Sequence, residues 1–566
     1  MIADMLTAVV ILTSVVLVGF LRRSATLNPA ERFTASRQLS WLTLGTSLAA
    51  SAMSADTPLL IAGAVYTDGL AGNWFWWAGA PGTLATLFFF ARMWRRSGVL
   101  TEVEVFRLRY GDGPAARRYR ALQALLEGVL LNVLVLASNA YAFGLVLNAM
   151  LARWRTEAAS HYALPLMVVC FVAAAAYALL VGFRGLVRSD AVGFLVAVAV
   201  AAILAVLAIS GLPGGPAALA DLIPSKSGGS VLDLWPAQDR FAPLLLLCVG
   251  WWHAAPGRGM LIQRVIASRD ERSAARTVAT FAALHYVARP WGWYLIGAAA
   301  LHYLPVGSQP DSALPALAGS LLPDGLFGIV LAVTALAFMG CVNSRLNFGA
   351  SYMVNDVALA MRPGLSRWAV RLVEAATVVT LTAVAIALVA LGVTGSIRAL
   401  YQFLGMTLAG TGFVAIARWY WWRTSIECEI ASLTSASAMA ALALRFVDIA
   451  APAEFAVAVA VNFAVGALVT IALAYLGPRT PEPCLVAFHE RVEPEGPGWR
   501  RFREVQGPGM LGVVCRWLLA NAALFSAILA VAALLSRDLR RSALLVAGSS
   551  TCLLLLGVTL KSKTVR

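Results

Sequence analysis

The sequence predicts an all-α protein that crosses a lipid bilayer about 15 times, and three observations lead to that prediction. The 566 residues are 60% hydrophobic and 13% charged, with a mean hydropathy of +0.77, far from the composition of a water-soluble globular protein. Apolar stretches of roughly 20 residues, the length a helix needs to span a membrane, recur along the chain. Basic residues concentrate in alternate connecting segments, as in polytopic membrane proteins.

Each expected span is an apolar segment that meets or approaches this length. In chain order the spans cover residues 5–20, 40–66, 70–93, 120–151, 160–183, 189–211, 240–258, 275–304, 324–342, 366–391, 397–420, 427–449, 453–476, 512–535 and 541–560. The first lacks a basic leading segment and a small-residue cleavage site. We therefore expect a retained helix there rather than a signal peptide.

The distribution of the basic residues behind the net charge of +15 indicates membrane topology rather than a nucleic-acid-binding surface. Segment 91–120 holds eight arginines and segment 258–276 holds five, whereas segment 212–239 holds one base against three aspartates. This asymmetry predicts a protein of the cell membrane with its N-terminus outside and its C-terminus in the cytoplasm. The basic residues that fall on the opposite side are Arg153, Arg155, Arg537, Arg540 and Arg541.

Two of the expected spans carry residues that should break a helix. Residues 40–66 place Ser51, Ser54, Asp56, Thr57 and Pro58 near the middle of an apolar segment. A carboxylate at that depth is costly and is retained mainly where it lines a cavity or pathway. Proline removes a backbone donor and frees carbonyl groups. The second segment is 240–258, which with the residues just after it collects Gly250, Pro256, Gly257 and Gly259.

Five spans begin at each break, and an odd number of crossings inverts the second set relative to the first. We expect repeats at 40–211 and 240–420, flanked by an N-terminal region 1–39 and peripheral helices in 427–566. Segment 477–511 is rich in proline and charge and is expected to be a cytoplasmic loop with little structure of its own. Matching breaks in two inverted halves indicate a central binding site.

Four motifs in order carry a resemblance to a known family. They are LTEVEVFRLRYG at 100–111, GLVRSD at 185–190, IQRVIASRDERSAA at 262–275 and LAFMGCVNSRLNFGASYMVNDV at 336–357. Together they resemble the sodium:solute symporter family, over about residues 40–420. The resemblance implies the five-plus-five inverted-repeat fold of that family, which the two broken segments indicate independently.

The resemblance also implies a sodium site between the first and eighth core helices. Its carbonyl ligands would come from Ala50, Met53 and Ala337, and its hydroxyl ligands from the positions of Gly340 and Cys341. Here the chain departs from the family, because glycine offers no side-chain ligand and a thiol suits a hard cation poorly. Water or another oxygen-bearing side chain would have to substitute; the candidates are Ser51, Ser54 and Asp190. Coupling to sodium, to a proton or to no ion therefore all stay open.

Asp190 matches the family's aspartate on the fifth core helix, which suggests a place on the ion pathway. A surface ion pair with Arg184 or Arg188 explains it equally well.

A solute pocket is expected between the two breaks, where Asp56 and Thr57 would face Trp251, Trp252 and His253. Each has a plainer explanation: Asp56 as a helix cap, the tryptophans as packing or interfacial residues, and His253 as a hydrogen-bonded packing residue. Tyr401 and Gln402 open the tenth core helix, which in the family closes the outer side of the pocket. Asn132 and Asn139 share one helix face, expected to look inward.

These features predict a secondary transporter for a small polar organic solute, working in the lipid bilayer, with sodium the leading coupling ion. The main alternative is a transporter-like sensor or binding component that moves nothing, which the loss of hydroxyls at Gly340 and Cys341 favours. An enzyme is not expected, because GxxxxGK[ST], HExxH and GxSxG motifs are absent from the sequence. The solute is not specified: Asp56 favours an amine, whereas His253 and Arg258 favour a carboxylate.

Overall fold

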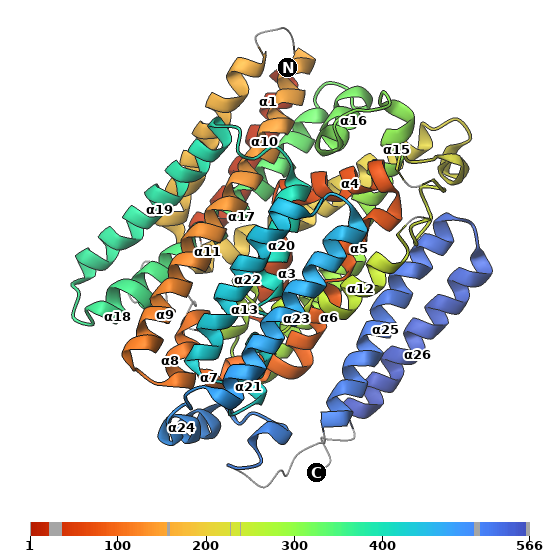
Figure 1. Ribbon diagram of the computed structural model, residues 1–566. Helices are drawn as coiled ribbons and strands as arrows, with labels where there is room; N and C mark the ends of the chain where they lie inside the picture. The colour runs from red at the N-terminus through yellow and green to blue at the C-terminus, as the bar shows by residue number, and fades with distance from the viewer. Residues whose placement is uncertain are drawn as a thin grey trace.

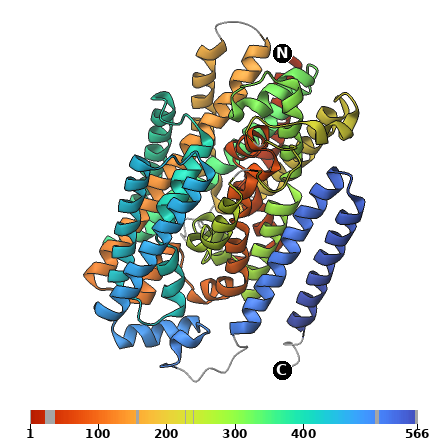
Figure 2. The same ribbon diagram turned by 45° about the vertical axis from the view of Figure 1, so that its right-hand side comes forward.

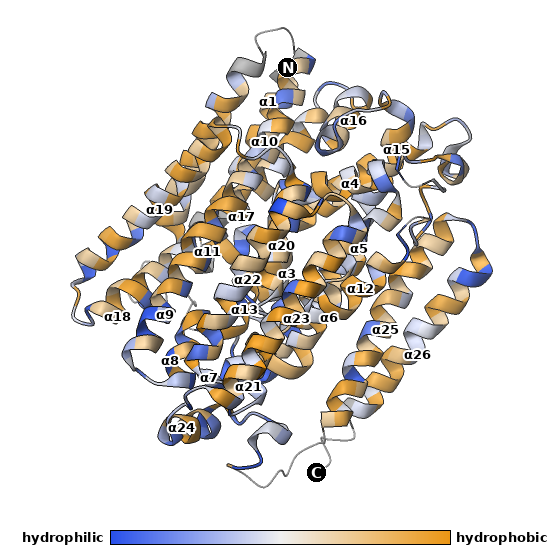
Figure 3. Cartoon of the chain, viewed as in Figure 1, coloured by the Kyte–Doolittle hydropathy of each residue, from blue (hydrophilic) through white to orange (hydrophobic). Residues whose placement is uncertain are grey.

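The computed structural model describes residues 2–21, 37–154, 159–226, 228–237, 239–502 and 510–561, and all regular structure in these ranges is helical. The helices form one bundle whose long members run roughly side by side (Figure 1). Apolar residues dominate the long helices, and hydrophilic residues gather toward the loops and helix ends (Figure 3). By length and composition the described residues hold nine candidate spans, or up to 11 when bent pairs are joined, so the expected count of about 15 is not confirmed.

The first half of the chain is built around a bent pair of helices, α3 and α4, which meet at 61°. Its main helices are α1 (Ile2–Leu21), α3 (Trp41–Ser51), α4 (Asp56–Asp68), α5 (Trp74–Trp77), α6 (Ala80–Ala85), α7 (Ala91–Ser97), α8 (Val105–Tyr110), α9 (Pro114–Leu125), α10 (Leu131–Trp154) and α11 (Ala159–Ser210). The long α11 contains two candidate spans, Tyr162–Val181 and Gly185–Ser210.

The second half, through α21, contains two interruptions. Its main helices are α12 (Phe241–Val249), α13 (Met260–Ile266), α14 (Glu271–Ala282), α15 (Trp291–Tyr303), α16 (Ala313–Leu321), α17 (Phe327–Tyr352), α18 (Leu359–Met361), α19 (Arg367–Ala390), α20 (Ile397–Ala409) and α21 (Gly412–Tyr420). Helix α17 is the most buried candidate span, with 78% of its apolar window inside the protein, and it packs against α1, α10, α11 and α19. Helix α17 therefore lies at the centre of the bundle.

Five further helices follow α21 in the chain. They are α22 (Ile426–Phe446), α23 (Pro452–Leu476), α24 (Glu482–Val492), α25 (Met510–Leu535) and α26 (Leu539–Lys561). Helices α25 and α26 form a hairpin at one edge of the bundle (Figures 1 and 2), and only 11% of the α26 window is buried. Most of α26 is thus exposed at the surface of the bundle.

Each break has a local cause. Pro58 is the third residue of α4, where backbone N–H groups have no partner within the helix, and Asp56 is the first, where a negative charge complements the helix dipole. These residues therefore start α4 rather than kink a continuous helix. After α12, Gly257 and Gly259 adopt positive φ values of 81° and 56°, and a Cβ at Gly257 would lie 2.3 Å from the Cδ1 atom of Ile262.

A third bend, of 46° between α20 and α21, was not among the expected breaks. It follows from close packing, because a Cβ on Gly410 would lie 2.3 Å from the amide oxygen of Asn462, and one on Gly466 would lie 1.8 Å from the Gly410 carbonyl. The backbones of α20 and α23 thus touch at the bend, and only glycine fits there.

Segment 477–511 is more structured than expected. It contains α24, whose Leu485, Phe488 and Val492 are buried. The fully buried Arg109 of α8 donates a 2.8 Å hydrogen bond to the Arg418 carbonyl and lies against the rings of Phe488 and Trp499. The prediction of a segment with little structure was therefore wrong for 482–492, where the buried apolar side chains of α24 pack against the bundle and cover Arg109.

Candidate functional site

The break between α3 and α4 surrounds a carboxylate that is fully buried. Asp56 accepts hydrogen bonds from the hydroxyls of Ser54, of Ser138 on α10 (2.8 Å) and of Tyr401 on α20 (3.0 Å). Thr57 lies within 3.4 Å of the same carboxylate. Buried charges are retained where hydrogen bonds satisfy them. Three helices distant in sequence therefore converge on one charged group.

Asparagine amides hold the interrupted backbone in place. The Ala55 N–H donates a 2.7 Å hydrogen bond to the side-chain oxygen of Asn139, whose amide nitrogen donates to the Phe338 carbonyl on α17 at 3.1 Å. Asn132, seven residues earlier on the same helix, donates to the Arg345 carbonyl at 2.9 Å. Asn132 and Asn139 thus both point from α10 toward α17.

A buried arginine occupies the carbonyl end of α3. Arg289, which is 1% exposed, donates to the Ala49 carbonyl at 2.6 Å and to the Ala52 carbonyl at 3.0 Å. The last carbonyls of a helix have no partner within it and carry partial negative charge, so a cation is stabilising there. The sequence analysis did not select Arg289. Its signal was a charged residue inside an expected span.

A second buried arginine joins α3, α11, α13 and α17. Arg264, also 1% exposed, donates 2.9 Å hydrogen bonds to the hydroxyls of Ser51 and Ser344. The hydroxyls of Ser47 and Ser51 donate in turn to Asp190, at 3.2 and 3.3 Å. Asp190 is thus a buried member of a polar cluster. Arg264 lies within the IQR motif, but the sequence analysis gave it no role.

Four of the five residues named as sodium ligands share a cavity with Asp190. This cavity has an empty volume of about 340 Å³, which includes space open to solvent. It is lined by Ala50, Met53, Ala337, Gly340 and Asp190. A Cβ on Gly340 would lie 3.1 Å from the Asp190 carboxylate, so the missing side chain leaves room for that group. Cys341 is buried nearby on α17.

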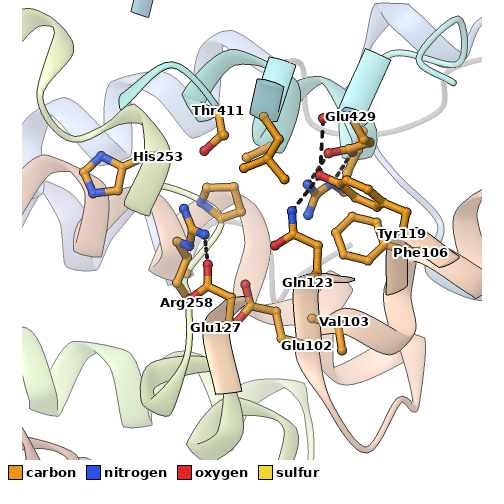
Figure 4. A pocket seen from close by; sticks show the side chains of 15 residues that line it. Glu102, Val103, Phe106, Tyr119, Gln123, Glu127, His253, Arg258, Thr411 and Glu429 are labelled. Carbon is orange, nitrogen blue, oxygen red and sulfur yellow. Dashed lines mark hydrogen bonds and ion pairs between the residues drawn. The ribbon is translucent and has the colours of Figure 1, made fainter. Parts of the chain in front are cut away.

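The remaining residues named for the solute pocket lie elsewhere. Trp251 and Trp252 stack on each other at 5.3 Å and contact Trp517 of α25 and Phe463 of α23. His253 lines a different cavity (Figure 4). Gln402 is buried on α20 beside Tyr401. The structure therefore brings Asp56, Thr57 and Tyr401 together and places the tryptophans and His253 apart from them.

The cavity that contains His253, called the α9 cavity below, is lined by ionisable side chains from α9, α21, α22 and adjoining segments (Figure 4). Glu127 forms an ion pair with Arg258, and Arg418 forms one with Glu429 at 2.8 Å. Glu102, in the segment between α7 and α8, accepts hydrogen bonds from the Gly259 N–H (2.6 Å) and the Tyr352 hydroxyl (3.2 Å). Burial, reinforced by the nearby Glu127 charge, raises the pKa of Glu102 to about 7.

A further ion pair lies at the other end of the bundle. Asp68, the last residue of α4, pairs with Arg398 near the start of α20. Nearby, the Tyr66 hydroxyl donates to the Pro305 carbonyl at 3.0 Å. Asp68–Arg398 thus links α4 to α20, whereas Glu127–Arg258 links the segment between α9 and α10 to the loop before α13.

Comparisons with known proteins agree with this architecture. The profile of the sodium:solute symporter family matches residues 32–421. The structure resembles that of a substrate-bound, outward-open Na⁺-coupled sialic acid symporter, with a TM-score of 0.68 and 16% identity, over 85% of this chain and 98% of the other.

Two other solved structures resemble it less closely. Mhp1, a nucleobase-cation-symport-1 family transporter, gives a TM-score of 0.45 and 13% identity, over 83% of this chain and 100% of the other. The structure of MhsT in complex with L-phenylalanine gives a TM-score of 0.45 and 16% identity, over 76% of this chain and 98% of the other. A comparison with curated protein sequences gives no match.

Proposed function

The chain belongs to the sodium:solute symporter family, and from that premise we propose that it moves a small polar organic solute across the cell membrane by alternating access. The N-terminus would lie outside and the C-terminus in the cytoplasm, as the arginine-rich segments 91–120 and 258–276 favour.

One observation carries this proposal: a fully buried, hydrogen-bonded carboxylate sits at a helix break and is reached by three helices. Asp56 joins α4, α10 and α20 through Ser138 and Tyr401. Broken helices with polar groups at mid-depth are where membrane carriers bind solutes, because the freed backbone and side-chain groups there lack helical partners. A purely structural bundle would gain more stability from apolar residues at these positions.

The charges around the break favour a solute that carries a carboxylate. Arg264 is linked to the Asp190 carboxylate through Ser51, Arg289 lies at the carbonyl end of α3, and Arg345 acts electrostatically on Tyr401, which bonds Asp56. Arg345 is only partly buried, and its Nε has no hydrogen-bond partner within the described ranges. It interacts electrostatically with Tyr401 and with Cys341, which places it beside the Asp56 cluster. An anionic group on the solute would offer Arg345 a partner.

The two peripheral ion pairs would act as gates. Asp68–Arg398 ties α4 to α20 on one side of the break, and Glu127–Arg258 ties the helix of α9 and α10 to the loop before α13 on the other. In this structure both pairs are formed and Asp56 is fully buried. Alternating access would break one pair at a time.

The test is uptake into proteoliposomes that contain the full chain, with labelled monocarboxylates, dicarboxylates and amino acids offered in separate pools. Sodium and proton gradients are imposed separately and together. We expect accumulation of a carboxylate-bearing solute, with at least a roughly tenfold loss in Asp56→Asn, since the loss of a charged hydrogen-bond partner costs about 1.5–3 kcal/mol. Protein-free liposomes are the control. Absence of flux for every pool under every gradient would contradict a transporter.

A binding component that moves no solute is the second candidate. The lack of hydroxyls at Gly340 and Cys341, where the family resemblance implies ion ligands, favours it. Saturable solute binding by the purified chain, without accumulation in the same proteoliposomes, would distinguish this candidate from a carrier.

A further inference from the structure

We propose that Glu102 is a proton-binding site built into the gate that Glu127 and Arg258 form, on the side of the bundle proposed to face the cytoplasm. The ligand is a single proton, which the carboxylate holds while the gate is closed and releases when the gate opens. The inference rests on the proposed transport function and adds an ion site in the α9 cavity, apart from the Asp56 cluster.

The charges that line the α9 cavity do not balance when Glu102 is ionised. Three carboxylates and two guanidinium groups line this cavity, and each guanidinium is already paired: Arg258 with Glu127, and Arg418 with Glu429 at 2.8 Å. Among the described residues Glu102 therefore has no arginine partner of its own, although both arginines act on it electrostatically. A poorly solvated carboxylate without a counter-ion favours its neutral, protonated form.

The hydrogen bonds of Glu102 leave one of its oxygens available for a proton. Its Oε2 atom accepts from the Gly259 N–H at 2.6 Å and from the Tyr352 hydroxyl at 3.2 Å. Within the described part of the chain the other oxygen, Oε1, has no hydrogen-bond partner, and the carboxylate lies beside that of Glu127 (Figure 4). A proton on Oε1 keeps both existing bonds and removes the repulsion between two neighbouring carboxylates.

Both sides of the gate consist of irregular backbone. Glu127 belongs to a π-helical turn, Leu126–Leu130, which interrupts the α-helical pattern between α9 and α10. On the other side, Arg258 precedes Gly259, whose φ of 56° favours glycine. Through the Gly259 N–H, Glu102 binds the same loop that carries Arg258. Opening of the gate would therefore move this loop away from Glu102 and let water reach the carboxylate.

Proton binding and gate closure are linked for this reason. In the closed structure burial, reinforced by the Glu127 charge, raises the pKa of Glu102 to about 7, and the entry of water would lower it toward its ordinary value of 4.5. The closed state thus binds the proton more tightly than the open state. A falling pH therefore favours the closed gate, and a rising pH favours the open one.

Other charged or titratable groups surround Glu102 on every element packed against it. They are Tyr119, Tyr352, Asp356, His253, Arg418 and Glu429, with Glu104 and Arg107 on its own segment. Glu104 pairs with Arg107 at 3.0 Å, and Asp356 pairs with Arg120 at 2.6 Å. Tyrosine hydroxyls ordinarily titrate near pH 10, about three units above Glu102. Among the residues that line the cavity, His253 is the other group whose side chain ordinarily titrates near neutrality, so the experiment must distinguish it from Glu102.

The experiment is an infrared pH titration of the purified full chain in lipid nanodiscs, which follows the carbonyl stretch of protonated carboxyl groups and needs no solute. Hydrogen exchange of residues 255–262, corrected for the intrinsic pH dependence of amide exchange, is measured in parallel about one pH unit below and above neutrality. The variants are Glu102→Gln, Glu127→Gln and His253→Asn. Glu104→Gln is the matched control, because Glu104 pairs with Arg107 and does not line the cavity.

We expect the unmodified chain to lose one carboxyl band with a midpoint at about pH 7, and residues 255–262 to exchange faster at the higher pH. Glu102→Gln should lack this band and exchange equally at both pH values, whereas His253→Asn and the control should keep the band. Glu127→Gln should move the midpoint to lower pH, because a like charge is lost and Arg258 becomes free to pair with Glu102.

Absence of the band, or pH-independent exchange, in the unmodified chain overturns the inference even when the variants fail to fold. A band that persists in folded Glu102→Gln, or that disappears in His253→Asn, also overturns it.

Failure of the proposed function has a different signature. If Glu102 titrates as expected and the uptake experiment shows no flux, the transport proposal fails while the proton site stands. If uptake occurs and its pH dependence is unchanged in Glu102→Gln, the transport proposal holds and this inference fails.

Discussion

The Tyr401 hydroxyl donates a 3.0 Å hydrogen bond to the buried carboxylate of Asp56 and so links α20 directly to the first residue of α4. The contact spans 345 positions of sequence. It ties the bent α20–α21 pair to the bent α3–α4 pair.

Tyr401→Phe removes this hydrogen bond and leaves the ring in place. Hydrogen bonds to buried charged groups are worth about 1.5–3 kcal/mol, so we expect the free energy of unfolding to fall by roughly that amount. Chemical denaturation of the full chain in detergent checks it. Tyr162→Phe, at a position 61% exposed, serves as the control and should change stability by less than about 0.5 kcal/mol. Equal stabilities of the two variants would contradict the contact.

Asn139→Ala should disrupt the break between α3 and α4. It leaves the Ala55 N–H and the Phe338 carbonyl without their partner, and each unsatisfied buried group costs about 1–3 kcal/mol. Hydrogen–deuterium exchange should rise in the 50–58 segment. Asn521→Ala, which loses one bond to the Trp517 carbonyl on α25, should leave exchange in that segment unchanged. Unchanged exchange in Asn139→Ala would refute the bridge.

Stability should fall as pH rises between about 4.5 and about 7 because of Glu102. Burial raises its pKa from 4.5 to about 7, so across this interval the folded chain holds a proton that the unfolded chain has released. Protonation therefore stabilises the fold below the interval, and that contribution is lost above it. Unfolding temperatures measured from pH 5 to pH 8 should show this slope. Glu102→Gln should make this slope shallower, whereas Glu490→Gln on the exposed face of α24 should leave it unchanged.

The Asp68–Arg398 pair should hold α4 and α20 together. Arg398→Ala should raise hydrogen exchange at the end of α4 and the start of α20, because a partly buried carboxylate is left without its partner. The exchanged pair, Asp68→Arg with Arg398→Asp, should restore protection at least in part. If the double variant exchanges as fast as Arg398→Ala, then the ion pair is not what closes this end.

Much of the fold could be predicted from composition and from helix-breaking residues, because both determine the structure of the segment in which they occur. The apolar segments indicated the helical membrane bundle, and Asp56 with Pro58 located the first break. The bend between α20 and α21 was not predicted, because it depends on contact between Gly410 and Gly466, which lie on different helices. A glycine in one helix does not reveal which backbone will approach it.

The same distinction between local causes and contacts distant in sequence applies to the candidate site. The structure brings together Asp56, Thr57 and Tyr401, because polar residues within apolar spans usually pair with one another in the protein interior. Arg264 and Arg289 were overlooked, although both are charged residues buried in the bundle. Their roles depend on which serines and carbonyls pack against them, and spacing along the chain does not encode those partners.

The burial of Arg109 has a consequence for biogenesis. Its carbonyl partner Arg418 is 309 residues downstream, and its aromatic cover on α24 and at Trp499 comes later still. At about 5–20 residues per second, the ribosome needs roughly 15–60 s to make that intervening chain. Throughout that interval the Arg109 guanidinium lacks these acceptors and aromatic contacts. A nascent chain truncated before residue 499 should therefore be a preferred substrate of membrane quality-control proteases.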